Sequence, residues 1–109
     1  GADLYLNNKL VTQVIIPEDI TSLIDSTFDG CTSITSVVIH KNITYIAWST
    51  FEDCNNLNTV YYTGTEAKWN NISIGNNSFK SITRYYYSAS EPDRIGNFWH
   101  YVDGVPTPW

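Results

Sequence analysis

The sequence lacks methionine throughout its 109 residues, position 1 included. It also has no run approaching the roughly 20 apolar residues that cross a bilayer, so we expect no membrane insertion. The N-terminus lacks the basic-then-apolar pattern of a signal peptide. We expect that Gly1 was exposed by processing or by excision from a longer protein, in which case the missing pattern says little about location.

Charge is scarce as well. Charged residues make up 16% of the chain, against about 25% in an average soluble protein. Six basic and eleven acidic side chains give a formal net charge of -5, which offers no general attraction to phosphate backbones or anionic lipid. Nucleic acid is therefore not an expected partner. The length fits one domain with a single core.

Chemistry-bearing motifs are missing too. The chain has no glycine-framed serine, no phosphate-binding loop and no His-Glu metal helix. Its two histidines, His40 and His100, are far apart and have no zinc-ligand spacing with either cysteine. We therefore predict a protein that is not an enzyme and needs no metal or cofactor.

What the sequence does contain is an internal repeat. Residues 20–23 and 43–46 begin matching segments 23 residues apart, within the 20 to 29 residues of leucine-rich repeats. The offset pairs Leu23 with Ile46, Phe28 with Phe51, Cys31 with Cys54, Ile34 with Leu57, Val37 with Val60, and Ile39 with Tyr62.

Partial or irregular units flank these two. The end of an earlier unit is visible in Val11, Val14 and Ile16. In a fourth unit, Trp69 stands where Ile46 predicts it. The next apolar positions then arrive two residues late, through Gly75-Asn76-Asn77, and these are Ile82, Tyr85 and Tyr87. Terminal repeats are expected to be irregular, because one of their sides faces solvent.

Each unit predicts a short strand and a return path. Residues 37–39 and 60–62 are β-branched or aromatic, which favours strands, whereas residues 24–28 and 46–51 suit helical or tight-turn segments. A single unit cannot bury its own apolar positions, so the units must stack. The residues expected to point inward are Leu23, Phe28, Cys31, Ile34, Val37 and Ile39.

The predicted fold class is an α/β repeat: a short leucine-rich-repeat solenoid with a parallel strand ladder, 23-residue units and an irregular C-terminal cap. We expect residues 1–88 to form the solenoid and residues 89–109 the capping tail. Asp103-Gly104 is a hairpin turn signal within that tail. The large side chains expected to cover the open end of the core are Phe98, Trp99, Tyr101 and Trp109.

A family resemblance follows from these segments. Residues 28–37 read FDGCTSITSV and residues 51–57 read FEDCNNL, which resembles the hallmark of BspA-like leucine-rich repeats, although Asp53 replaces the glycine of the first copy. Residues 61–72, YYTGTEAKWNNI, are similar to the segment that often follows the last repeat of bacterial members. The resemblance implies a surface or secreted bacterial protein whose repeats mediate adhesion or other binding.

Strand alternation predicts the outward residues. If Val37 and Ile39 point inward, Ser36, Val38 and His40 point outward. Across the units, one outer column contains Ile15, Val38, Tyr61 and Tyr86, flanked by Gln13, Ser36, Thr59 and Arg84 on one side and by Pro17, His40, Thr63 and Ser88 on the other. An exposed apolar column predicts a contact surface; alternatively, such residues are simply good strand formers.

The cysteines and tryptophans leave alternatives open. Cys31 and Cys54 share one repeat position, so they should lie about 5 Å apart on adjacent rungs, which allows a disulfide but favours two reduced, buried thiols. Exposed Tyr and Trp could instead stack on sugars, although Trp48 and Trp69 are expected to cover the edge of the solenoid.

The resulting hypothesis is a noncatalytic protein-binding or adhesion module of a cell-surface or secreted repeat protein. Its partner would be a protein, such as a host extracellular protein, or a glycan. The candidate binding face is Ile15, Val38, Tyr61 and Tyr86, with Ser36, His40, Thr59 and Arg84 as its rim. The alternatives are a structural end of a longer repeat array without its own ligand, and a glycan-binding module.

Overall fold

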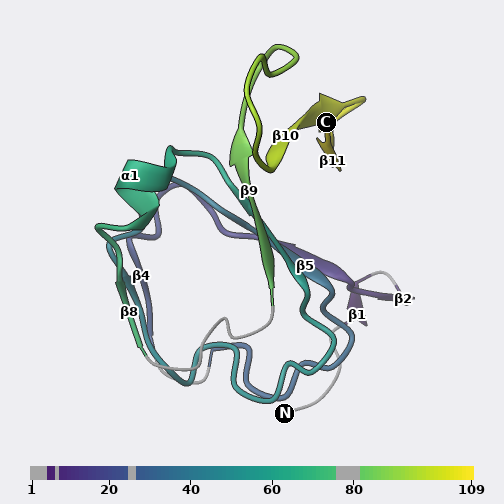
Figure 1. Ribbon diagram of the computed structural model, residues 1–109. Helices are drawn as coiled ribbons and strands as arrows, with labels where there is room; N and C mark the ends of the chain where they lie inside the picture. The colour runs from purple at the N-terminus through teal and green to yellow at the C-terminus, as the bar shows by residue number, and fades with distance from the viewer. Residues whose placement is uncertain (1–4, 7, 25–26, 76–81) are drawn as a thin grey trace.

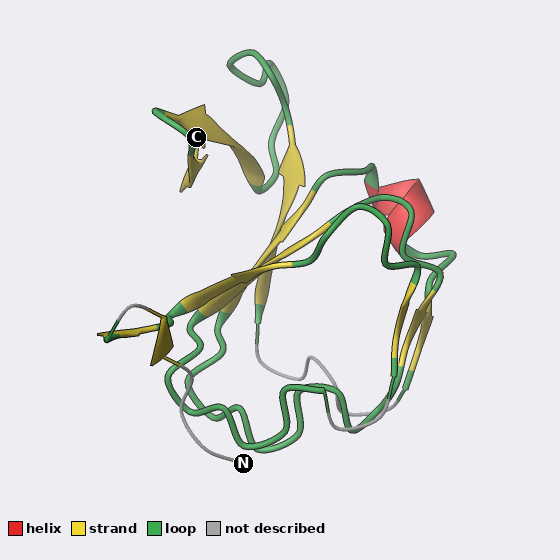
Figure 2. Ribbon diagram, turned by 180° about the vertical axis from the view of Figure 1, so that it is seen from behind, coloured by secondary structure: helices red, strands yellow, loops and turns green. Residues whose placement is uncertain are grey.

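The solenoid predicted from the repeat is confirmed by the computed structural model, which describes residues 5–6, 8–24, 27–75 and 82–109 (Figure 1). The chain winds in successive coils around one core, and a hairpin follows at the C-terminal side of the last coil. Figure 2 shows that strands and turns make up nearly all of each coil. The helix α1 (Glu66–Trp69) interrupts one coil.

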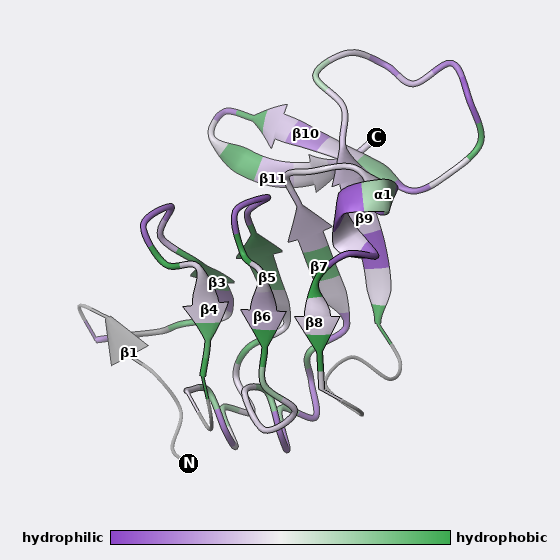
Figure 3. Cartoon of the chain, turned by 90° about the vertical axis from the view of Figure 1, so that its left-hand side faces the viewer, coloured by the Kyte–Doolittle hydropathy of each residue, from purple (hydrophilic) through white to green (hydrophobic). Residues whose placement is uncertain are grey.

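Two sheets lie on opposite sides of the coil. The main sheet has the order β11-β10-β9-β7-β5-β3, and a smaller sheet on the return path has the order β4-β6-β8. Figure 3 shows the smaller sheet in front of the main one. The main sheet contains β3 (Gln13–Ile15), β5 (Ser36–Ile39), β7 (Thr59–Tyr62), β9 (Thr83–Tyr87), β10 (Phe98–Val102) and β11 (Val105–Pro108). The smaller sheet contains β4 (Ser22–Leu23), β6 (Tyr45–Ile46) and β8 (Ser73–Ile74). A separate antiparallel pair joins β1 (Tyr5–Leu6) to β2 (Lys9–Leu10).

The core fills the space between the two sheets. Five of the six residues predicted to point inward belong to it, and Phe28, which is half-buried, packs against it; Ile34, Val37 and Ile39 are fully buried. Phe28 and Phe51, one repeat apart, stack with their ring centroids 5.3 Å apart. Side chains at one repeat position therefore form columns along the solenoid.

Backbone hydrogen bonds join each coil to the next. The amide of Thr35 donates to Thr12 O at 2.8 Å, Asn58 N to Thr35 O at 3.1 Å, and Thr83 N to Asn58 O at 2.9 Å. The return path has the same pattern, with Thr44 N donating to Thr21 O at 2.8 Å. These bonds satisfy polar backbone groups that burial between coils would otherwise leave unpaired.

The departure at Asp53 does not change the backbone. Gly30 has φ 70° and Asp53, at the same repeat position, has φ 60°. Both residues are in the left-handed region, which glycine adopts freely and aspartate tolerates better than most residues. The repeat turn therefore keeps its shape although its glycine is replaced.

On the return path, one open alternative is resolved and one expectation is wrong. Residues 46–51 form the end of β6 and then turns, without a helix, so the tight-turn alternative is right there; of residues 24–28, positions 25–26 lie outside the described residues. Trp69 does not replace Ile46, since Ile46 pairs with Ile74 of β8. Trp69 lies on α1, an insertion that precedes β8.

The tail continues the main sheet. β10 pairs with β9 in parallel and with β11 in antiparallel. The predicted hairpin turn is present, with φ 51° at Asp103 and φ 79° at Gly104, the positive angles that a type I′ turn requires. The main sheet thus has strands on both sides of residue 88, and the division into 1–88 and 89–109 stays a prediction.

Candidate binding site

The predicted outer column is correct for its first three members and wrong for the fourth. Ile15 pairs with Val38, and Val38 with Tyr61, but Tyr61 pairs with Tyr85. Tyr86 pairs with Tyr62 and packs against the core. The sequence predicted that the last unit is two residues longer than the 23-residue repeat, whereas the pairing of Tyr61 with Tyr85 makes it one residue longer. Of Gly75-Asn76-Asn77, to which the prediction assigned the extra residues, the asparagines lie outside the described residues.

The same shift moves the rim. Thr83, not Arg84, pairs with Thr59. Arg84 pairs with Val60 and lies on the core side of the sheet, where its guanidinium carbon is 5.2 Å from the centre of the Trp69 ring. Arg84 and Tyr86 are consequently neighbours on the opposite face from the one predicted.

The middle of the predicted face is covered. Val38 is 3% exposed and Tyr61 is 9% exposed, because both pack with Trp99 of β10 in a second apolar cluster. The Trp99 ring lies 5.4 Å from that of Tyr61 and 4.9 Å from that of Tyr101. The prediction that Val38 and Tyr61 form an exposed stripe is therefore wrong.

The margins of this face are partly open. Ile15, on the edge strand β3, is 60% exposed. Ser36 and Thr59 are half-buried, and Ser36 accepts a hydrogen bond from Gln13 Nε2 at 2.9 Å. On the other side of Trp99, Tyr101 is 47% exposed.

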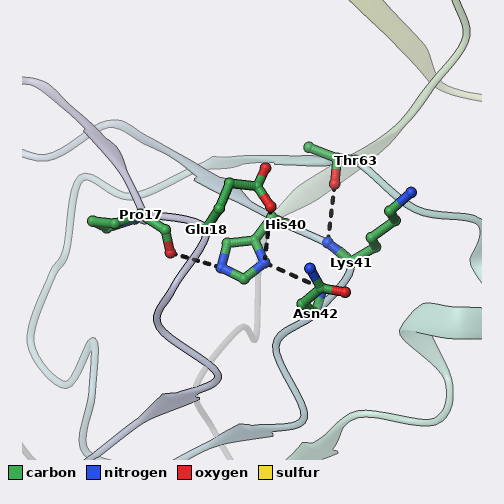
Figure 4. Close-up of polar contacts among 6 residues, drawn as sticks. All are labelled: Pro17, Glu18, His40, Lys41, Asn42 and Thr63. Atoms are coloured by element: carbon green, nitrogen blue, oxygen red, sulfur yellow. Dashed lines mark hydrogen bonds and ion pairs between the residues drawn. The ribbon is translucent and has the colours of Figure 1, made fainter.

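His40 is buried, contrary to the prediction, and Figure 4 shows its polar contacts. Its Nδ1 accepts a hydrogen bond from the backbone N–H of Asn42 at 3.2 Å, so Nε2 carries the proton and donates to Pro17 O at 2.8 Å. The carboxylate of Glu18 lies 3.8 Å from Nδ1 but is mostly exposed. The imidazole thus joins two coils through the backbone, and it is not a rim residue.

The cysteines are reduced and buried, as favoured from the sequence. Cys54 donates a hydrogen bond through Sγ to Phe28 O at 2.9 Å. Burial raises the pKa of the Cys54 thiol, so the reactive thiolate is disfavoured. The two cysteines therefore have a structural role: both pack in the core, and Cys54 also links its coil to the previous one.

A cleft lies where the solenoid meets the tail, and we refer to it as the junction cleft. Its volume is about 620 Å³, within the range of small-ligand pockets. It is lined by Gly64, Thr65, Glu66, Ile82, Thr83, Arg84, Tyr86, Tyr87, Arg94, Ile95, Gly96, Asn97 and Phe98. The lining therefore comes from the start of α1 and the residues before it, from β9 and the residue before it, and from the start of β10 and the loop before it.

Two guanidinium groups face this cleft, each held against an aromatic ring. Arg94 lies 4.5 Å from the centre of the Phe98 ring, and Arg84 lies over Trp69 while its Nε donates to the Tyr86 hydroxyl at 3.4 Å. Stacking of this kind orders a guanidinium without using most of its five N–H donors. Both side chains thus present donors in a fixed place.

An unsatisfied hydroxyl lies behind the cleft wall. Tyr62 is fully buried, and within the described part of the chain its hydroxyl has no hydrogen-bond partner. Gly64, which lines the cleft, covers it: a Cβ at position 64 would lie 3.0 Å from the Tyr62 oxygen. Burial, and next the neighbouring Tyr86, raise the pKa of Tyr62.

We expect Tyr62→Phe to raise the free energy of unfolding by about 1 kcal/mol, since a buried, unpaired hydroxyl costs about 1–3 kcal/mol. Urea denaturation at neutral pH measures the change, and Tyr101→Phe, at an exposed ring, is the control.

Because the folded state raises the pKa of Tyr62, the stability that Tyr62 contributes to the wild type should be complete below the ordinary pKa near 10 and fall as the pH rises past it. Tyr62→Phe should lose less there, and a variant less stable than wild type at neutral pH would reveal a partner for the hydroxyl.

The described residues contain neither a candidate metal-binding cluster nor a membrane-spanning helix. No group of three or more His, Cys, Asp or Glu side chains lies close enough there to hold a metal ion. None of the helices described is long and apolar enough to cross a membrane.

Comparisons with known proteins agree on the family. The family model for the BspA type leucine-rich repeat region (6 copies) matches residues 1–90. A leucine-rich cell surface protein from Faecalibacterium prausnitzii A2-165 has a similar solved structure, with a TM-score of 0.56 and 32% sequence identity. The match covers 66% of this chain and 18% of that one, so this chain spans less than a fifth of its relative. A search of curated proteins finds no match. The chain belongs to the BspA-type leucine-rich repeat family.

Proposed function

We propose that this chain is a noncatalytic binding module of a surface repeat protein and that it binds its ligand in the junction cleft. The cleft is the observation that carries the proposal. It combines aromatic and cationic side chains from three segments, of which Arg94 is exposed and Arg84 and Tyr86 are half-buried, a composition typical of ligand sites. The sheet face predicted earlier supports this role less well, because Trp99 covers its centre.

A surface location is part of the proposal. It is supported by the family and by the similar structure, which is that of a cell surface protein. Partners available at a cell surface are host extracellular proteins and glycans, and the net charge of -5 disfavours nucleic acid. The absence of a catalytic motif in the sequence supports a noncatalytic role.

Two variants test the location of the site. Arg94→Ala combined with Ile95→Ser removes an exposed wall of the cleft, since both residues are exposed and Ile95 contacts solvent on all sides. Tyr101→Ser is the control on the sheet face. On an array of extracellular proteins and glycans, the cleft variant should lose the wild-type hits while the control retains them. The reverse pattern would move the site to the sheet face.

The hairpin supports a second candidate function, closure of the strand ladder. Trp109 N donates to Phe98 O, so alternate residues of β11 direct their N–H groups to β10, and Pro106 and Pro108 occupy the positions that face away. Proline has no N–H, so this edge offers no donor there to another strand. A folded protein that binds nothing on the array would favour this candidate over the binding module.

A further inference from the structure

We infer that the junction cleft takes a saccharide that carries a carboxylate; this rests on the proposed function and names the class of its ligand. Arg84 and Arg94 supply two guanidinium groups, and Glu66 is the one carboxylate among the lining residues. Guanidinium forks match carboxylate geometry and form strong, charge-assisted pairs. Among the described residues neither arginine is in an ion pair, so both charges are available to a ligand.

The two arginines give the cleft a positive charge although the chain as a whole is acidic. The protein has six basic residues against eleven acidic ones, yet two of the six line this one cleft. A net charge of -5 repels a polyanion at long range. A ligand with few negative charges, held locally by the two arginines, fits this balance better than an acidic peptide with many.

The rest of the lining suits a sugar ring. Tyr86 is half-buried and contributes aromatic surface to the lining, on which the apolar face of a sugar can stack. Phe98 is buried and holds Arg94, and the Tyr87 ring packs against Trp99 and Tyr101. The cleft volume of about 620 Å³ accommodates a few rings.

The strand edges argue against an extended peptide. β9 crosses the cleft and pairs with β7 on one side and with β10 on the other. A peptide that adds to a sheet requires an open strand edge, and β9 offers none over its paired residues. Recognition in the cleft must therefore rely on side chains and loop backbone, as sugar recognition does.

The Tyr62 hydroxyl behind Gly64 is a further feature that favours a negatively charged ligand. The Tyr62 hydroxyl has no partner among the described residues and lies directly behind Gly64. Gly64 lines the cleft, and a Cβ there would lie 3.0 Å from the Tyr62 oxygen, so the glycine backbone approaches this hydroxyl closely. In this poorly solvated place an O–H dipole interacts strongly with a nearby negative charge.

The test uses trigalacturonic acid, its methyl ester and sialyllactose, with binding measured by calorimetry on the whole chain. We expect the acid to bind and the neutral ester to bind at least about tenfold more weakly, as loss of a charge-assisted pair implies. The sialyllactose arm distinguishes a sialic acid from a uronic acid as the source of the carboxylate. Rising ionic strength should weaken binding of the acid.

Charge-removing variants separate this inference from the proposed function. Arg84→Gln with Arg94→Gln should lose the acid at least about tenfold, whereas Lys41→Gln, which removes a charge outside the cleft, should bind as wild type. Equal binding of acid and ester, or binding unchanged in the double variant, would overturn the carboxylate inference while a cleft ligand of another class stands. If neither acidic sugar binds while array hits still depend on Arg94 and Ile95, the inference also fails but the cleft survives. A glutamate-rich peptide that binds better than both sugars would likewise overturn it.

Discussion

Trp99→Ala is expected to lower the free energy of unfolding by about 3–5 kcal/mol, the range for truncating a buried tryptophan. Trp99 is fully buried and contacts the rings of Tyr61, Tyr87 and Tyr101. Its indole Nε1 also donates to Tyr62 O at 2.7 Å. The side chain thus attaches the hairpin to the solenoid by packing and by a hydrogen bond.

Two comparisons separate these contributions. Trp99→Phe keeps a six-membered ring but loses the pyrrole part of the indole together with its N–H, so its loss should be smaller than that of Trp99→Ala, about 1–3 kcal/mol, much of it the cost of an unpaired buried carbonyl. Trp109→Ala removes a ring that is 45% exposed and should cost less than Trp99→Ala. Chemical denaturation followed by far-ultraviolet circular dichroism measures all three. Unfolding of Trp99→Ala at the wild-type midpoint would mean that the hairpin is not anchored through this residue.

Trp99 also explains why the burial of the predicted face could not be recognised from the repeat. Alternation correctly assigns Val38 and Tyr61 to the outer side of the strands. Whether an outward residue is exposed depends on what packs over it, and Trp99 is 37 residues from its hydrogen-bond partner Tyr62. The repeat period contains no information on a contact between the tail and an earlier coil.

The complete units were predictable because one offset applies to all their positions. Val37 pairs with Val60 and Ile39 with Tyr62, as 23-residue spacing requires. In the last unit, α1 intervenes and the sequence from Thr83 to Tyr87 consists largely of strand formers. Three consecutive tyrosines suit either face, so the one-residue error in register could not be detected, and the inward position of Arg84 was missed with it.

Neither the burial of His40 nor the junction cleft could be predicted from the sequence, for different reasons. Polar residues are expected at outward positions, but His40 is buried because the Pro17 carbonyl, one coil earlier, accepts its N–H. The one available signal was that Pro17 and His40 share a column. Arg94 and Ile95 lie in an irregular loop, and only the folded chain brings that loop to β9 and to the segment before α1.

Gly75→Ala is expected to be the most disruptive of the small substitutions. A Cβ at position 75 would lie 2.5 Å from the Trp48 Cα and closer still to its backbone nitrogen and Cβ. Gly75 N donates to Ile46 O at 2.9 Å, so the two coils meet backbone to backbone here. No change of rotamer can relieve a contact with backbone, and we expect a loss of about 3 kcal/mol, at the upper end of the usual range for overpacking.

Gly104→Ala is the matched control for this substitution. Nothing lies within 4 Å of a Cβ at Gly104, although its φ of 79° strains any residue other than glycine. The control should therefore lose about 1 kcal/mol, the backbone cost alone. Thermal denaturation of both variants decides the question: a Gly75→Ala midpoint at or above that of Gly104→Ala would show that the coils can separate at little cost. A much lower midpoint would establish that close approach of adjacent coils at Gly75 is required for the solenoid to stack.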